Sequence, residues 1–156
     1  MQDKKERRIR TWVRVAHVYQ KGFRALADRL TEVGLSVAQF DLLACLVKAE
    51  PDLLKQSELA NRLLVTKGNI SGMLNRMTEQ GLVNRADDAV DKRSKRITIT
   101  DQGRELYQRG RQIQESLLDE MFQGVEQDKV EFLEQVVSEI CERIDLGCRW
   151  PNKEQE

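Results

Sequence analysis

The chain has 156 residues, of which 40% are hydrophobic and 33% charged, and its 26 basic and 26 acidic side chains give a net charge of zero. This length and composition predict a single globular domain over residues 1–156, rich in helix-favouring residues and stable without disulfides. No segment approaches the roughly 18 to 20 apolar residues of a membrane span, and the opening residues lack the apolar core of a signal peptide. The three cysteines form no CxxC pair and fit a reducing compartment. We therefore expect a cytoplasmic protein that does not contact membranes.

The charges are separated along the chain although they cancel overall. Residues 62–96 carry eight basic and four acidic side chains, a net charge of +4, whereas residues 101–156 carry seven basic and fourteen acidic ones, a net charge of −7. The first 61 residues carry the remaining +3. A neutral protein with a positive central segment remains compatible with a nucleic-acid partner.

Apolar residues recur at alternating steps of three and four near both ends of the chain, which predicts long amphipathic helices there. Such narrow seams are more typical of a helix–helix dimer interface than of a monomer's surface helix, and packing within one chain's own bundle is the alternative. We assign about 1–32 and 104–146 to N- and C-terminal dimerisation helices. The seams comprise Ile9, Trp12, Ala16, Tyr19, Phe23, Leu26 and Leu30, then Ile113, Leu117 and Met121, then Val130, Leu133, Val137, Ile140 and Ile144.

The middle of the chain, about 36–101, has shorter helices bounded by capping and turn residues. Ser36 is expected to cap a helix that runs to about residue 48, and a second helix is expected over 56–64. Thr66 then caps a third over 67–80, which ends at Gly81. Two short helices joined by a tight turn form a helix-turn-helix.

After the third helix the apolar pattern changes to period two, which predicts a β-hairpin. Its strands lie near 82–85 and 96–100, its tip is charged, and Thr100 or Asp101 caps the helix that follows. A helix-turn-helix followed directly by a basic hairpin is the winged form. The expected fold class is therefore mainly α with a small β-hairpin wing, flanked by the dimerisation helices.

The helix over 67–80 has one apolar face, which must point inward and therefore fixes the opposite face. Gly68, Gly72 and Asn75 point most nearly outward. Two glycines in a helix cost about 1 kcal/mol each relative to alanine, and a close approach to the major groove would explain them; a solvated face with tolerated glycines is the alternative. We expect Asn69 and Asn75 to pair with adenine edges, and the basic and hydroxyl side chains to reach phosphates or base acceptors. The expected DNA-binding residues of this helix are Thr66, Lys67, Gly68, Asn69, Ser71, Gly72, Asn75 and Arg76.

The hairpin tip concentrates positive charge. Asp91 stands two residues before Arg93, close enough across a tight turn to hold its guanidinium in one direction, ready to enter a narrow minor groove. Charge runs are more often merely solvated, and only the neighbouring helix favours DNA contact here. The expected wing residues are Arg85, Asp91, Lys92, Arg93, Ser94, Lys95 and Arg96.

Residues 35–106 resemble the MarR family of transcriptional regulators. The motifs that carry the resemblance are SELA, the GLV that opens the wing, the DxR of Asp91 and Arg93, and the TxxG of Thr100 and Gly103. The resemblance implies a homodimer whose terminal helices interlock, with recognition helices in successive major grooves and wings in the flanking minor grooves. It further implies a sequence-specific regulator of transcription, a ligand-responsive repressor on a pseudo-palindromic double-stranded operator, whose grip a small ligand or an oxidant loosens.

The same resemblance places an effector cleft between the terminal helices and the winged lobe. Trp12, His17, Phe40 and Cys45 are candidate wall residues, although core or interface is the favoured explanation of each, and an aromatic or phenolic effector is the expected class. We expect no cofactor and no metal, because a single histidine and scattered cysteines do not make a ligand set. Peroxide sensors of the family carry a cysteine near the start of the first helix, which this sequence lacks, whereas Cys148 leaves another thiol-based route open.

Two other classes of function compete with DNA binding. A winged helix can serve protein contacts, in which case the basic wing only solubilises the lobe and no salt-sensitive DNA affinity is expected. An enzyme is disfavoured, because no nucleophile–base pair, paired carboxylates or phosphate-binding glycine loop stands out.

Overall fold

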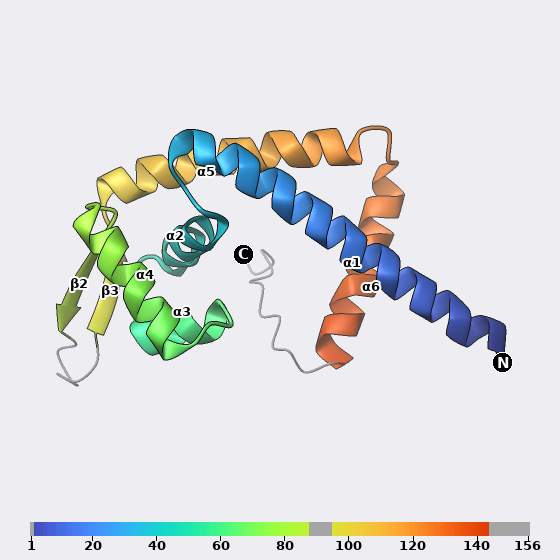
Figure 1. The fold of residues 1–156 in the computed structure, drawn as a ribbon, viewed down its shortest axis with the longest axis horizontal. Coiled ribbons are helices and arrows are strands. Elements are labelled where there is room, and N and C mark those ends of the chain that lie inside the picture. Colours follow the sequence, from blue (N-terminus) through green and yellow to red (C-terminus); the bar gives the residue numbers. More distant parts are fainter. Residues whose placement is uncertain (1, 88–94, 144–156) are drawn as a thin grey trace. The chain divides into compact units, whose positions relative to one another are not determined.

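The computed structural model describes residues 2–87 and 95–143. By their contacts these fall into two units, Met1–Leu118 and Asp119–Glu156, which are described separately. The fold is mainly helical with a small antiparallel sheet, as expected from the sequence. Its elements in chain order are α1 (Gln2–Leu30), the 3-10 helix η1 (Thr31–Val33), α2 (Val37–Ala49), β1 (Leu54–Lys55), α3 (Gln56–Arg62), α4 (Lys67–Glu79), β2 (Val83–Asp87), β3 (Lys95–Ile99), α5 (Asp101–Phe122) and α6 (Gln127–Arg143) (Figure 1).

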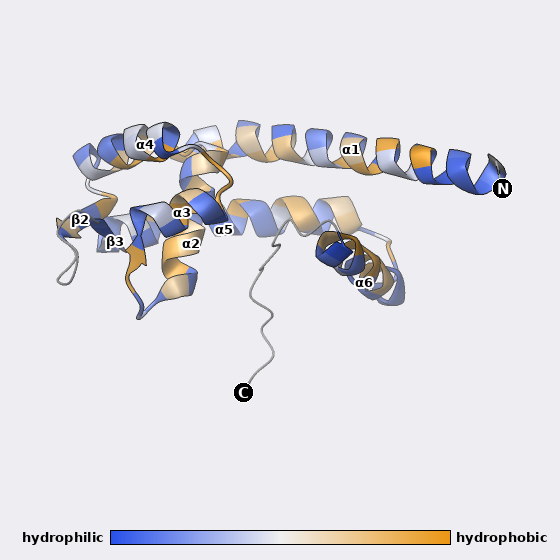
Figure 2. Cartoon of the chain, turned by 90° about the horizontal axis from the view of Figure 1, so that it is seen from below, coloured by the Kyte–Doolittle hydropathy of each residue, from blue (hydrophilic) through white to orange (hydrophobic). Residues whose placement is uncertain are grey.

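The core of the first unit lies where α2, α3, α4 and the sheet meet. Leu42 and Leu43 of α2, Leu59 of α3, and Ile70 and Leu74 of α4 are all completely buried. Helix α2 is apolar along much of its length, which Figure 2 shows as orange, because it is covered by other elements on more than one side. This shared core holds the helix-turn-helix and the sheet as one lobe.

Helices α2 and α4 begin at the capping residues that the sequence indicates. Ser36 Oγ accepts from the amide of Gln39 at 3.3 Å, and Gln39 Oε1 accepts in return from the amide of Ser36 at 3.0 Å. Thr66 Oγ1 accepts from the amide of Asn69 at 3.2 Å. Both caps satisfy amides that a helix leaves unpaired at its first turn, so each start is fixed within one residue.

The turn between α3 and α4 is closed by backbone hydrogen bonds and one left-handed residue. The amide of Val65 donates to the carbonyl of Ala60 at 3.0 Å, and Leu64 adopts φ 53°. A leucine in this region is uncommon, and here its side chain is 78% exposed, so it contributes little burial in return. The tight turn sets the second helix of the motif at a fixed position against the first.

The wing is a three-stranded sheet in the order β1-β3-β2, not the two-stranded hairpin expected. Pairing runs from Val83 opposite Ile99 to Asp87 opposite Lys95, so β2 extends past the end that the sequence indicated and β3 starts one residue earlier. The added strand β1 pairs Leu54 with Ile97. The strand β1 has only two residues, which are too few to show a period-two pattern in the sequence. It forms because it pairs with β3, which is distant in the sequence.

The helices α1 and α6, each taken within its own unit, carry exposed apolar side chains. On α1, Trp12 is 70% and Tyr19 67% exposed, and exposed Val13, Val15 and Val18 widen the apolar surface beyond the expected seam. The described part of the second unit, residues 119–143, comprises the end of α5 and α6, and α6 has no buried residue. Its seam residues Leu133, Val137 and Ile140 are all exposed, while Ile144 lies outside the described residues.

The length and apolarity of the described helices decide whether any of them could span a membrane. Within the described residues no single helix has the length and apolarity to span a bilayer; the pair Asp3–Val33 and Val37–Ala49 passes together only with an 82° bend, and α2 belongs to the buried core.

A bidentate ion pair ties the start of α5 to the end of α2. Arg104 donates through Nη1 and Nη2 to the two carboxylate oxygens of Glu50, at 2.5 and 2.6 Å. The hydrogen bond from Arg104 lowers the pKa of Glu50 below its ordinary value, which keeps the pair ionised in mildly acidic solution. Because the pair is exposed, it orients α5 more than it stabilises the lobe.

The first turn of α5 packs against the start of the wing through Thr100 and Gly103, the residues of the TxxG motif. Thr100 Oγ1 accepts from the amide of Gly103 at 3.0 Å and donates to the carbonyl of Gly81 at 2.7 Å. Thr100, rather than Asp101, is therefore the N-cap of α5. A Cβ on Gly103 would lie 2.1 Å from the carbonyl oxygen of Leu82, closer than any tolerated contact. Only glycine allows this approach.

The Gly103→Ala variant should therefore be strongly destabilised. The added methyl group must displace the backbone at Leu82, for which about 3 kcal/mol of unfolding free energy is expected, at the upper end of overpacking effects. Urea unfolding followed by circular dichroism at fixed protein concentration measures it. The exposed neighbour offers a control, since Glu105→Ala should change stability by less than about 0.5 kcal/mol. Equal stability of the two variants would show that the contact at Leu82 is not tight.

Candidate DNA interface

Helix α4 turns its apolar face inward as expected. Ile70, Leu74 and Met77 are completely buried and Met73 is 8% exposed. The opposite face carries the residues expected to meet DNA: Thr66, Lys67, Gly68, Asn69, Asn75 and Arg76 are exposed, and Ser71 and Gly72 are half-buried. Their role in DNA binding remains a prediction, but their placement on one accessible side of α4 agrees with it.

The two glycines of this face have no structural reason to be glycine. A Cβ on Gly72 would meet nothing within 4 Å, and one on Gly68 would meet only Thr66 Oγ1 at 4.0 Å. Neither glycine has a positive φ. Neither packing nor backbone conformation therefore explains why glycine, which destabilises a helix relative to alanine, stands at these two positions. This favours an explanation in contact with a partner molecule.

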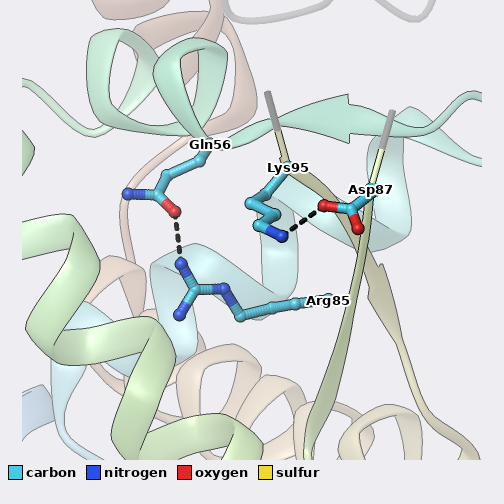
Figure 3. A network of polar contacts seen from close by, with 4 residues as sticks. All are labelled: Gln56, Arg85, Asp87 and Lys95. Carbon is cyan, nitrogen blue, oxygen red and sulfur yellow. Dashed lines mark hydrogen bonds and ion pairs between the residues drawn. The ribbon is translucent and has the colours of Figure 1, made fainter. Parts of the chain in front are cut away.

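A polar network joins α4 to α3 and the wing, with Arg85 at its centre. Arg85 Nη2 donates to Gln56 Oε1 at 2.7 Å (Figure 3), and Arg85 Nη1 donates to Asn75 Oδ1. Gln56 in turn donates through Nε2 to Ser71 Oγ at 2.6 Å. Arg85 is half-buried because the alternation of β2 places it on the same side as Val83, which is 1% exposed. The guanidinium thus holds Asn75 directly and Ser71 through Gln56.

The other described wing residues also have partners within the chain. Lys95 pairs with Asp87 across the hairpin (Figure 3), and Arg96 Nη1 donates to the carbonyl of Leu53 at 2.7 Å. Of the predicted wing residues, Lys95 is exposed, whereas Arg85 and Arg96 are half-buried. Asp91, Lys92, Arg93 and Ser94 lie outside the described residues, so their DNA contact stays a prediction.

The four candidate wall residues of an effector cleft occupy different environments. Trp12 and His17 are exposed on α1, whereas Phe40 is 2% exposed and stacks on Tyr107 with ring centroids 5.6 Å apart. Cys45 is half-buried, and desolvation raises the pKa of its thiol, which disfavours the reactive thiolate. Phe40 is explained as core, and the thiol of Cys45 is poorly suited to sensing oxidants.

A shallow hollow of about 570 Å³ lies elsewhere, between the end of α1 and the start of α2. None of the four candidate wall residues lines it. In residues 2–87 and 95–143 no group of three His, Cys, Asp or Glu side chains could hold a metal ion. The hollow is bordered by Phe23, Ala27, Thr31, Gly34, Leu35, Ser36, Val37 and Ala38.

Sequence reasoning missed Gln56 and the inward direction of Arg85. The direction of Arg85 was accessible, because it stands two residues after the buried Val83 in a period-two strand. The role of Gln56 had no local signal, since the contact arises only when the start of α3 is folded against β2 and α4.

The sequence matches the MarR family model over residues 33–94. It is 27% identical over 120 residues to the HTH-type transcriptional regulator PrsX of Escherichia coli, covering 77% of this chain and 72% of PrsX. It is also 33% identical over 98 residues to an uncharacterized HTH-type transcriptional regulator of Bacillus cereus, covering 63% of each.

Solved structures share the fold over most of the chain. A variant of Escherichia coli MarR in complex with operator DNA superposes with a TM-score of 0.74 and 27% identity, covering 85% of this chain and 95% of MarR. The transcriptional regulator BldR from Sulfolobus solfataricus superposes with a TM-score of 0.74 and 25% identity, covering 87% of this chain and 98% of BldR.

A Gly72→Ala variant should separate folding from DNA contact. The methyl group has space within the protein, so the variant should be more stable by about 1 kcal/mol, the helix propensity difference. Its affinity for duplex DNA should fall, because the same methyl group stands between α4 and the groove. Thermal unfolding and fluorescence anisotropy with a labelled duplex measure the two effects.

The matched control is Thr78→Ala, which also raises helix propensity in α4 and removes only the hydroxyl bond to the carbonyl of Leu74. It should leave DNA affinity unchanged. If Gly72→Ala binds DNA as tightly as the unaltered protein, α4 does not approach DNA at this residue.

Proposed function

Since this chain is a MarR-family winged helix-turn-helix regulator of transcription that binds DNA, we propose that it acts as a homodimeric repressor on a pseudo-palindromic operator. The observation that carries the proposal is the outward face of α4, where two glycines without an internal role stand among exposed hydrogen-bonding side chains. A side of α4 with little bulk suits a deep seat in the major groove. Regulation of this kind requires no catalytic step.

The homodimer is supported by the uncovered apolar side chains of α1 and α6. Trp12 at 70% and Phe132 at 66% exposure are large apolar surfaces that a second copy would remove from water. The two recognition helices of a two-fold dimer would then meet half-sites about one helical turn apart, which gives the operator its near-palindrome. Residues 1–156 would form one MarR-type domain in this arrangement, with α1, α5 and α6 as dimerisation helices.

The proposed effector is a small aromatic or phenolic molecule that changes the separation of the two DNA-binding lobes. The hollow beside α1 and α2 has a volume within the usual range of ligand sites, and Phe23, Leu35 and Val37 give it an apolar border. An occupant there would contact both the dimerisation helix and the helix that leads into the lobe. This position supports release of DNA through a change in the angle between them.

Binding to the intergenic DNA upstream of its own gene tests the proposed function. Titrations at several salt concentrations, with random duplex as competitor, should give tight binding that survives the competitor and a log–log salt slope of about −5 or steeper if some six phosphates are engaged. Arg93→Ala should weaken binding to all sequences and flatten that slope, because a groove-inserted charge adds mainly electrostatic affinity. Binding no tighter than to random DNA, or a monomer at micromolar concentration, would contradict the proposal.

A further inference from the structure

We infer that Arg85 fixes the hydrogen-bond polarity of the recognition helix, so that Ser71 and Asn75 meet base edges as donors and select guanine rather than adenine. This inference rests on the proposed function, because it assigns the base preference of the same helix. It also replaces the expectation that Asn75 pairs with adenine.

The position of Arg85 makes it part of the protein interior rather than a free wing cation. It stands on the inner side of β2 opposite Ile97, which is 1% exposed, and its guanidinium reaches both α3 and α4. Its two terminal nitrogens each have an acceptor in the chain, Gln56 Oε1 and Asn75 Oδ1. A half-buried guanidinium with these bonds stays in place when the wing meets DNA, because turning outward would leave both acceptors unpaired.

The direction of every bond in the network follows from the chemistry of arginine. A guanidinium has five N–H donors, no acceptor, and remains protonated at any physiological pH. Asn75 must therefore face it with Oδ1, and Gln56 with Oε1. The Nε2 of Gln56 is then left to donate to Ser71 Oγ. Neither amide can be reversed without bringing an NH2 group against the guanidinium.

The outward side of α4 is consequently biased toward donors. Asn75 is exposed and presents its Nδ2 hydrogens, while Ser71 Oγ accepts from Gln56 and retains its hydroxyl hydrogen for a DNA acceptor. The second lone pair of Asn75 Oδ1 lies beside the Nη1 of Arg85, so a base amino group that approached it would meet a cation. Adenine presents such an amino group in the major groove, whereas guanine presents two acceptors, N7 and O6.

Selection from a randomised duplex library tests the inference with the full-length protein. Asn75→Ala identifies the operator position that depends on Asn75, since the preference there should disappear. The unaltered protein should prefer guanine at that position. Arg85→Met, which keeps the apolar stem, should shift the ratio of guanine to adenine toward adenine by roughly fivefold or more, which corresponds to about 1 kcal/mol, the lower end of the discrimination of a good base contact.

Gln56→Glu is the matched control. A glutamate still accepts from Arg85 but cannot donate to Ser71, so the guanine preference at the Asn75 position should survive. If Arg85→Met does not fold, Arg85→Gln, which can donate or accept, should produce the same shift. In the absence of DNA, Arg85→Met and Asn75→Ala should each lower the unfolding midpoint. The loss in the double variant should be smaller than the sum of the two single losses, because both substitutions remove the same hydrogen bond between Arg85 and Asn75.

The outcomes separate this inference from the proposed function. A library from which the unaltered protein enriches no sequence contradicts the proposed function. Enrichment with adenine at the Asn75 position, or a guanine preference that Arg85→Met leaves intact, overturns the inference while the proposed function stands. Additive midpoint losses in the DNA-free protein also overturn it, since the network would then be absent.

Discussion

Burial of the apolar face of α4 is the constraint on which the site depends. Ile70, Met73, Leu74 and Met77 enter the lobe's core, each at most 8% exposed, and removing four such side chains from water stabilises the fold by several kcal/mol in total. Rotation of α4 about its axis would expose them. The face with Gly68, Gly72 and Asn75 is therefore held outward by packing on the opposite side.

Arg85 adds to this constraint by connecting the recognition helix with the wing. Its bonds to Gln56 and Asn75 join α3, α4 and β2 through one guanidinium, and the sheet register fixes the strand from which it extends. Thr100 and Gly103 join the start of α5 to the same wing. Contiguous contacts therefore run from the first turn of α5 through the wing to α4, which is compatible with the proposed control by an effector.

Much of this architecture could be predicted from local patterns. Three kinds of feature depend on residues within a few positions of one another, so sequence spacing determines them. They are the helix caps at Ser36 and Thr66, the inward face of α4, and the period-two hairpin. Other features depend on contacts between segments that are distant in the sequence. These are the strand β1, the hydrogen bonds of the Gln56 amide, and the hydrogen bond from Arg96 to the carbonyl of Leu53. The DNA contact expected of Arg85 stays a prediction, whereas alternation along β2 places its side chain against α3 and α4. Phe40 is buried in the core, which is the alternative that the sequence already favoured for it.

The most direct test of the central claim, that α4 enters the major groove as one of a symmetric pair, is methylation footprinting of the protein on its operator. Dimethyl sulfate modifies guanine N7 in the major groove and adenine N3 in the minor groove, so the protected groove is identified directly. The account predicts two patches of protected guanine N7 on one face of the duplex, separated by about one helical turn. Protection confined to the minor groove, or a single patch, would contradict it.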